Sequence, residues 1–190
     1  MKKKLIASVI VASALLQGCM TAAVVTVVGG AAVVNDNRSI GKLIDDQKIE
    51  LDAHAKLSQN DGLSDNANIQ VVSVNGKVLI VGQAKNTYLR DSAIKILNEV
   101  DGIEHIYDQI RISNLTSIST RTNDVWLTSK VKAALLGSDV VDATNIKVVT
   151  ENGEVFLMGL IDNKQADEAV DVARHISGVN RVFKMFEYIN

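Results

Sequence analysis

The chain has 190 residues, of which 47% are apolar and only 4% aromatic, and it contains one Cys and no Pro. These values are typical of a small globular protein and exclude collagen-like, disulfide-scaffold and intrinsically disordered classes. Three of the basic residues are Lys2, Lys3 and Lys4, so the rest of the chain carries 17 basic against 22 acidic side chains, a net of −5. That balance argues against non-specific nucleic-acid binding, which requires a basic face.

The start of the chain has the features of an export signal. Three lysines are followed by an apolar core from Leu5 to Leu16 and by a small residue, Gly18, so we expect residues 1–18 to be removed. A second apolar run, Met20 to Val34, is shorter than the roughly 20 residues needed to cross a bilayer. We expect residues 19–39 to form a tether. The alternative is a single uncleaved membrane helix from Leu5 to Val34.

The tetrapeptide Leu16-Gln17-Gly18-Cys19 resembles the lipobox of bacterial lipoproteins. The resemblance implies cleavage before Cys19 and acylation of its sulfur and amino group, and several acyl chains anchor a protein stably. Because Met20 is not Asp, the inner-membrane retention residue, the resemblance implies the inner leaflet of the outer membrane, facing the periplasm. The alternative is that Cys19 is simply a small apolar residue in a membrane stretch.

An internal repeat is the most informative feature of the sequence. Residues 69–82 and 146–159 align at an offset of 77 without a gap. Each copy has two apolar, β-branched runs around an Asn-Gly pair, Asn75-Gly76 or Asn152-Gly153. Both residues of such a pair tolerate positive φ, so each copy predicts a type I′ β-hairpin. The chain therefore contains the same unit twice.

Helical spacing of apolar residues surrounds each hairpin. The preceding stripes are Ile49, Ala53 and Leu57, and Leu127, Val131 and Leu135; the following stripes are Ala93, Ile96, Leu97 and Val100, and Ala169, Val172, Ala173 and Ile176. The following helices are expected to end at Asp101-Gly102 and Ser177-Gly178, before a closing strand. The acidic pair Asp45-Asp46 is interpreted as helix-start charge.

The order helix, strand, strand, helix, strand predicts the fold class α+β. We expect two tandem two-layer αββαβ sandwiches, each with two helices on one face of a three-stranded mixed sheet. Their expected bounds are residues 40–113 and 123–190, joined by a linker at 114–122. A unit of about 70 residues is marginal alone, so we expect the two units to pack together.

The repeated pattern resembles the BON domain of periplasmic osmotic-shock and nodulation proteins. It consists of Asp-x-x-(apolar)-x-x-x-Val-x-x-x-Leu, a hairpin whose second strand ends in Gly, and a helix that closes in (Ser/Asp)-Gly-(Val/Ile). With the lipobox and the stretches 123–132 and 150–160, the whole chain to Asn190 is similar to the dual-BON outer-membrane lipoproteins of enteric bacteria. That resemblance implies a role in envelope integrity. The first copy matches less closely, because its first helix lacks a Trp.

Residues typical of catalysis or metal binding are sparse. His54, His105 and His175 have no partner at metal-ligand or triad spacing, and a single Cys forms no ligand pair. The sequence also contains no nucleophile elbow or phosphate-binding glycine loop in a suitable setting. We therefore expect a protein that is not an enzyme and has neither metal nor cofactor.

One helix has the composition of a membrane-binding element. Trp126, the only Trp, lies about 100° from Leu127 on the helix predicted from about Asp124 to Leu136, with Lys130 at i+4. Indole and lysine side chains at the edge of an amphipathic helix are typical of a lipid interface. This helix carries a net charge of +1 and its counterpart in the first copy −1, so only the second suits anionic lipid. The alternative is that Trp126 packs between the domains.

In the dual-BON lipoproteins that the chain resembles, this helix binds anionic phospholipid, chiefly phosphatidylglycerol, and the proteins gather at division sites. Carried over by position, the resemblance places Trp126, Lys130 and Lys132 at the headgroups, with Ala133 and Leu136 as apolar neighbours. A second hypothesis is an interaction module, in which the first BON domain or the hairpin edges dock a periplasmic protein such as outer-membrane assembly machinery. Lipid contact would then be incidental.

Overall fold

The structure, a computed structural model, describes residues 39–189, which belong to one compact unit of the chain. The expected signal peptide, the lipidated Cys19 and the tether before residue 39 lie outside the described residues. Within the described range, no helix combines the length and the apolarity that a membrane span requires.

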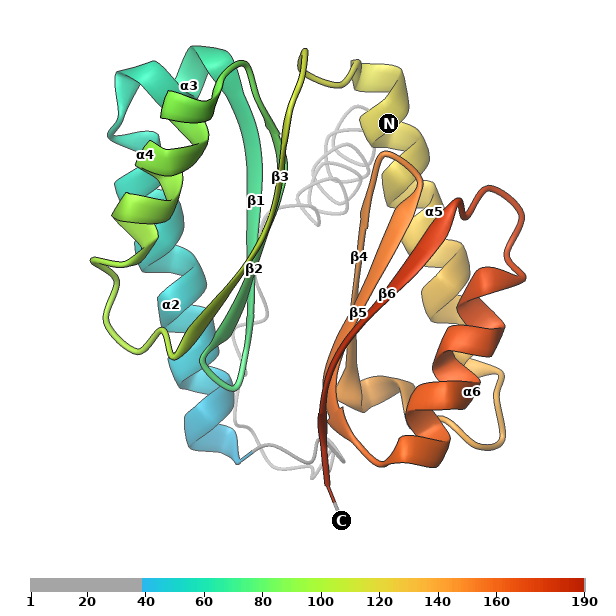
Figure 1. Ribbon diagram of the computed structural model, residues 1–190. Coiled ribbons are helices and arrows are strands. Elements are labelled where there is room, and N and C mark those ends of the chain that lie inside the picture. The colour runs from blue at the N-terminus through green and yellow to red at the C-terminus, as the bar shows by residue number, and fades with distance from the viewer. Residues whose placement is uncertain (1–38, 190) are drawn as a thin grey trace, which may run out of the picture. The chain divides into compact units, whose positions relative to one another are not determined.

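Each repeat folds as helices packed on one face of a three-stranded sheet (Figure 1). The first repeat contains α2 (Ile40–Ser58), α3 (Asp61–Asn66), β1 (Ala67–Val74), β2 (Lys77–Ala84), α4 (Thr87–Leu97) and β3 (His105–Ile112). The second contains α5 (Ile118–Leu136), the 3-10 turn η1 (Ala143–Asn145), β4 (Ile146–Glu151), β5 (Glu154–Ile161), α6 (Asn163–Arg174) and β6 (Arg181–Tyr188). In each sheet the hairpin strands are antiparallel and the last strand pairs in parallel with the middle one. The predicted α+β fold with two mixed sheets is confirmed.

The Asn-Gly turns have the predicted type I′ signature. The φ angles are 54° at Asn75 and 77° at Gly76, and 51° at Asn152 and 75° at Gly153. Positive φ at both central residues matches the turn to the right-handed twist of the strands it joins. In the first hairpin Val74 pairs with Lys77, so only the two turn residues lie outside the ladder between β1 and β2.

The ends of several helices differ from the sequence-based expectation. Helices α4 and α6 end at Leu97 and Arg174, before the glycines at 102 and 178. After α4 the amides of Glu99 and Val100 donate to carbonyls three residues back, so the α-helical ladder has already ended. The two glycines still adopt positive φ, in the turns that lead into β3 and β6.

Helix α5 begins at Ile118 and not near Asp124, so it includes part of the segment expected as linker. Ser117 sets this start, because its side chain accepts a hydrogen bond from the Thr120 amide as an N-cap. The first repeat also has the short additional helix α3, which Asn60 caps in the same way through the Leu63 amide. Local serine and asparagine caps thus add helix that apolar spacing alone does not predict.

Three hydrophobic clusters stabilise the described unit. One lies between α2, α4 and the first sheet, and a second between α5, α6 and the second sheet. The third joins side chains of both sheets, and its buried members are Val72, Val74, Leu79, Val81, Val149, Phe156 and Met158. The two repeats therefore share a core, as expected from the marginal size of each unit alone.

Candidate functional site

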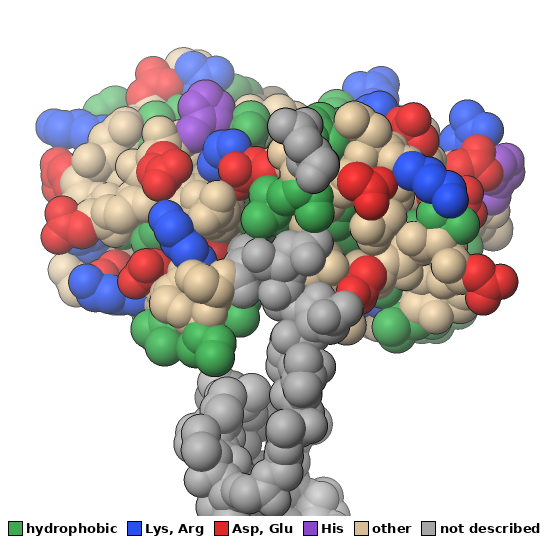
Figure 2. All heavy atoms as spheres, turned by 90° about the horizontal axis from the view of Figure 1, so that it is seen from below, with side chains coloured by type: hydrophobic (Ala, Val, Ile, Leu, Met, Phe, Trp, Pro, Cys, Tyr) green, Lys and Arg blue, Asp and Glu red, His purple; other side chains and the backbone are tan. Residues whose placement is uncertain are grey.

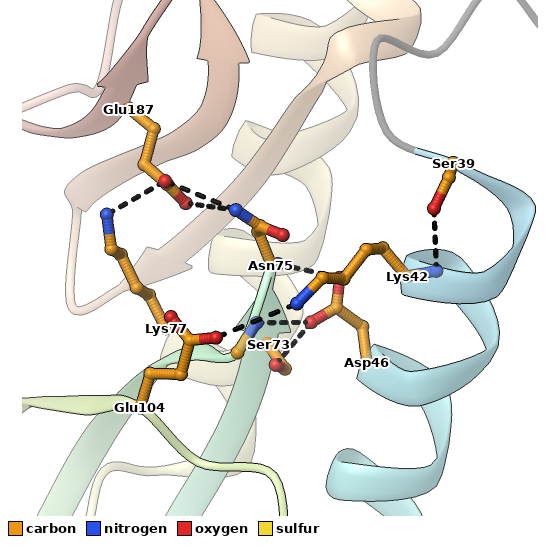
Figure 3. A network of polar contacts seen from close by, with 9 residues as sticks. Ser39, Lys42, Asp46, Ser73, Asn75, Lys77, Glu104 and Glu187 are labelled. Carbon is orange, nitrogen blue, oxygen red and sulfur yellow. Dashed lines mark hydrogen bonds and ion pairs between the residues drawn. The ribbon is translucent and has the colours of Figure 1, made fainter.

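A buried aspartate on the first helix of each repeat fixes the hairpin turn. In the first repeat, the Asp46 carboxylate accepts hydrogen bonds from the amides of Asn75 (2.8 Å) and Gly76 (2.9 Å) and from the Ser73 hydroxyl (2.7 Å). Figure 3 shows Asp46 pointing from α2 to this turn. In the second repeat, Asp124 accepts from the corresponding amides of Asn152 and Gly153 at 2.8 and 2.9 Å.

This arrangement corrects the interpretation of Asp45-Asp46 as helix-start charge. Helix α2 begins six residues before Asp46, which is only 2% exposed. Hydrogen bonds from backbone amides stabilise the charge of a buried carboxylate. They also pair amides of the turn that would otherwise have no hydrogen-bond partner. The pair of contacts also fixes α5 against the second hairpin, so the side chains around Asp124 point in defined directions.

With its core stripe and Asp124 turned inward, α5 presents an apolar stripe outward. Ile118, Val125 and Leu136 are spaced by 7 and 11 residues and share one side of the helix, at 75%, 68% and 69% exposure. Trp126 adjoins them at 60% exposure, so it is not buried between the domains. Ala133, seven residues after Trp126, is also exposed. The sequence analysis had identified Trp126, Ala133 and Leu136 but missed Ile118 and Val125.

Basic side chains flank this stripe on both sides. The Lys130 ammonium lies 3.9 Å from the centroid of the Trp126 ring and donates to the Ser177 carbonyl oxygen at 2.7 Å. Such a cation–π contact holds the indole and the charge together. Arg121 and Lys132 are exposed on the opposite flank. Because Asp124, the one acidic residue of α5, is buried at the turn, the exposed charge of this helix is wholly positive.

The corresponding helix of the first repeat lacks this combination. Asp46 and Asp124 align at an offset of 78, which places Lys48 at the position of Trp126 and Asp52 at that of Lys130. Helix α2 has exposed Ile40, Ile44 and Leu51, but Lys42 is paired with Glu104. Within residues 39–189, an apolar stripe flanked by basic side chains that form no salt bridge is therefore a property of α5 and not of the repeated unit.

Polar contacts link the two repeats around the shared core. Glu187 of β6 pairs with Lys77 at 2.9 Å and accepts from the Asn75 side chain, next to the first hairpin turn (Figure 3). Lys147 of β4 pairs with Glu50 at 2.7 Å and donates to the Ser73 carbonyl oxygen at 2.9 Å. These contacts join β6 to the first hairpin, and β4 to α2 and the edge strand β1.

The described residues contain no cluster of metal ligands, and the face seen in Figure 2 is mixed in charge. Residues 39–189 contain no group of three or more His, Cys, Asp or Glu side chains that could hold a metal ion. On the face shown in Figure 2, lysine and arginine side chains are interspersed with aspartate and glutamate. The exposed charges of α5, in contrast, are all of one sign.

Comparison with known proteins identifies the family. The family described as "BON domain" matches residues 45–114 and again residues 123–190. The chain belongs to the BON-domain family. Its two BON domains coincide with the two repeats, the second of which includes most of α5.

Several known proteins are similar to this chain over most of its length. The chain is 36% identical to "Outer membrane lipoprotein DolP" of Haemophilus influenzae over 98% of this chain and 97% of that one. It is 40% identical to "21 kDa hemolysin" of Actinobacillus pleuropneumoniae, covering 81% of this chain and 79% of that one. It is 28% identical to "Osmotically-inducible protein Y" of Escherichia coli over 80% of this chain and 77% of the relative. This is therefore a dual-BON protein that is similar over nearly its full length to an outer-membrane lipoprotein.

Proposed function

We propose that this dual-BON protein is a non-enzymatic outer-membrane lipoprotein, anchored through Cys19 in the inner leaflet, whose α5 binds anionic phospholipid. Its similarity to an outer-membrane lipoprotein over 98% of the chain supports the anchor and the location. We further propose that phosphatidylglycerol is the preferred lipid, that α5 concentrates the protein at division sites where such lipid accumulates, and that this supports outer-membrane integrity.

The apolar stripe of α5 and its basic flanks carry the lipid-binding proposal. An exposed Trp with three large aliphatic neighbours on one helix face is unfavourable in water, whereas Trp is favoured at the headgroup level of a bilayer. Lys130 and Lys132 lie on either side of the stripe, where lysine side chains extend toward phosphates. Ala133 adds apolar surface beside Trp126 and lets the helix approach the membrane closely.

The expected affinity of α5 alone for a membrane is weak. Each basic residue near an anionic surface contributes about 1 kcal/mol, or about 3 kcal/mol for the three on α5. Partial burial of Trp126, Val125 and Leu136 adds roughly 1 kcal/mol each. These favourable terms are partly cancelled by the loss of translational freedom on binding, so a fragment without the lipid anchor should bind weakly. The acyl chains on Cys19 would hold α5 near the bilayer and raise its effective concentration there.

Vesicle binding of residues 34–190 tests this function, because that fragment contains all three hydrophobic clusters. It should co-sediment with phosphatidylglycerol vesicles, less so as salt rises, and not with neutral vesicles. Trp126→Glu should abolish binding, whereas Tyr88→Glu, which changes an exposed aromatic residue on α4, should not. Equal binding by both variants would contradict a role for α5.

A groove in the first BON domain favours protein docking as a second candidate function. It has a volume of about 490 Å³ and lies between α2 and the edge strand β1, lined largely by Leu51, Leu57, Leu63, Ile69 and Val71. The backbone amide of Ser73 points away from β2 and donates to Glu50. Because backbone direction alternates along a strand, the backbone N–H and C=O groups of Ile69 and Val71 also point outward from this edge. An extended segment of an assembly-machinery protein could add to this edge. Pulldown partners lost in Leu51→Glu but retained in Trp126→Glu would favour this function.

A further inference from the structure

A second groove lies next to the apolar stripe, on the flank of α5 that carries Arg121 and Lys132. It has a volume of about 480 Å³ and is bounded by α5, the edge strand β4 and the start of β1. Thr128 and Ser129 line it from α5, Thr150 and Glu151 from β4, and Asn68 and Gln70 from β1. Val125 belongs both to this groove and to the stripe, so the groove opens beside the surface proposed to meet the membrane.

The two repeats differ in chemistry at this position. At the offset of 78, Glu50, Leu51 and His54, which line the groove of the first repeat, are replaced by Thr128, Ser129 and Lys132. The fold itself does not require this difference, because both helices keep the aspartate at the turn and apolar core residues at matching positions. The groove of the second repeat is therefore more polar than that of the first and carries the additional basic side chain of Lys132.

The groove brings basic and acidic side chains together. Arg121 and Lys132 supply positive charge from α5, and the exposed Lys132 forms no ion pair with residues 39–189. Glu151 is attracted electrostatically by Arg121 and accepts a hydrogen bond from the side-chain amide of Gln83, which is itself 2% exposed and accepts from Thr116. Asp124 also borders the groove, but its carboxylate is occupied by the two turn amides.

This inventory suits a ligand with an anionic group and a hydroxyl-bearing group side by side. Arginine and lysine recognise phosphate through charge-assisted hydrogen bonds. A fixed carboxylate and a carboxamide, Glu151 and Gln70, are acceptors for vicinal hydroxyl groups. The same carboxylate would repel a headgroup that carries its own carboxylate.

We propose that this groove is a headgroup site that selects a phosphodiester bearing a glycerol diol. Arg121 and Lys132 bind the phosphate, and Glu151 and Gln70 accept hydrogen bonds from the hydroxyl groups. The inference rests on the proposed lipid-binding function and adds its specificity: α5 supplies membrane attraction, and the groove distinguishes phosphatidylglycerol from phosphatidylserine, which has the same net charge.

The test compares residues 34–190 on vesicles with equal mole fractions of phosphatidylglycerol or phosphatidylserine in a neutral lipid. The wild type should bind phosphatidylglycerol about tenfold more tightly, the effect of one or two hydrogen bonds. Glu151→Gln removes the carboxylate that repels phosphatidylserine, so it should reduce this preference severalfold by improving phosphatidylserine binding. The new side chain should stay in place, because its amide oxygen still accepts from Gln83. Gln70→Ala, on the exposed edge of β1, should weaken binding to phosphatidylglycerol alone. Lys132→Gln should lower phosphatidylglycerol binding more than Lys130→Gln, which removes the same charge outside the groove.

A soluble arm separates the lipid headgroup from free phosphate. Glycerophosphoglycerol should shift the NMR amide signals of Thr128 and Thr150, and inorganic phosphate at the same concentration should shift them less. Equal shifts would reduce the groove to a phosphate site and overturn the diol assignment. Wild-type binding to both anionic lipids with equal affinity would overturn the groove site while leaving the proposed function intact. Failure to bind either vesicle would contradict the proposed function itself.

Discussion

The buried aspartate at each hairpin turn predicts a large difference between two neighbouring substitutions. Asp46 accepts three hydrogen bonds at 2.7–2.9 Å, whereas Asp45, the preceding residue of α2, is exposed. In Asp46→Asn, the side-chain oxygen can still accept from the Ser73 hydroxyl and the Gly76 amide, which share one carboxylate oxygen in the wild type. The new NH2 group then faces the Asn75 N–H, which donates to the other oxygen in the wild type. One charge-assisted hydrogen bond is lost, and two donors oppose one another in a buried site.

The expected loss of stability follows from these contacts. A hydrogen bond to a charged group contributes about 1.5–3 kcal/mol, and an unsatisfied buried donor costs about 1–3 kcal/mol. We therefore expect Asp46→Asn to lower the free energy of unfolding by about 2–4 kcal/mol, or about 6–12 °C in Tm for a unit of this size. Asp45→Asn should change it by less than about 0.5 kcal/mol. Urea and thermal denaturation measure both, and equal stability of the two variants would refute the role given to Asp46.

Three further changes test other parts of the account. Gly153→Val places a β-branched residue at φ 75° with its Cβ against the Asn180 side chain, so thermal denaturation should show a loss of about 1–3 kcal/mol; an unchanged Tm would contradict the type I′ turn. Phe156→Ala removes a ring that is 2% exposed and stacks on Phe183 with centroids 4.8 Å apart, so chemical denaturation should show a loss of about 3–5 kcal/mol; a negligible loss would argue against the shared core. Burial raises the pKa of Glu151, and the hydrogen bond from Gln83 offsets part of this shift. Folding therefore disfavours the charged form, so the contribution of Glu151 to the free energy of unfolding declines as pH rises from about 4 through the raised pKa. Glu151→Gln lacks this decline, so its stability relative to wild type should increase over that range, and a constant difference would contradict the assignment.

The repeat and its hairpins could be predicted from the sequence because their signals are local. An Asn-Gly pair determines the turn, and an offset of 77 reveals the second copy without any knowledge of packing. The role of Asp46 was not predicted, since its partners at Ser73, Asn75 and Gly76 are 27–30 residues away. The common signal was an Asp three residues before the core stripe of both helices, followed by the same Asn-Gly turn.

The shared core had a signal that the two-layer interpretation did not use. Val78, Leu79, Ile80 and Val81 form an unbroken apolar run in β2, and such runs are typical of strands covered on both faces. Alternate residues of this run belong to the helix-facing cluster and to the cluster between the sheets. On α5, Val125 was missed because the outward apolar residues were chosen by their spacing from Trp126 and by the family resemblance. Ile118 was missed because the helix begins there and not near Asp124, a start that the Ser117 cap determines.

The fluorescence of Trp126 during vesicle binding tests the central claim most directly, because this residue is the only Trp in the chain and is 60% exposed in the described structure. Phosphatidylglycerol vesicles should shift its emission to shorter wavelength, and phosphatidylglycerol with bromine-labelled acyl chains should quench it, whereas neutral vesicles should do neither. The Asp45→Asn variant should behave as the wild type. Co-sedimentation with phosphatidylglycerol vesicles without any change in Trp126 emission would show that another surface binds the membrane, and it would contradict the role proposed for α5.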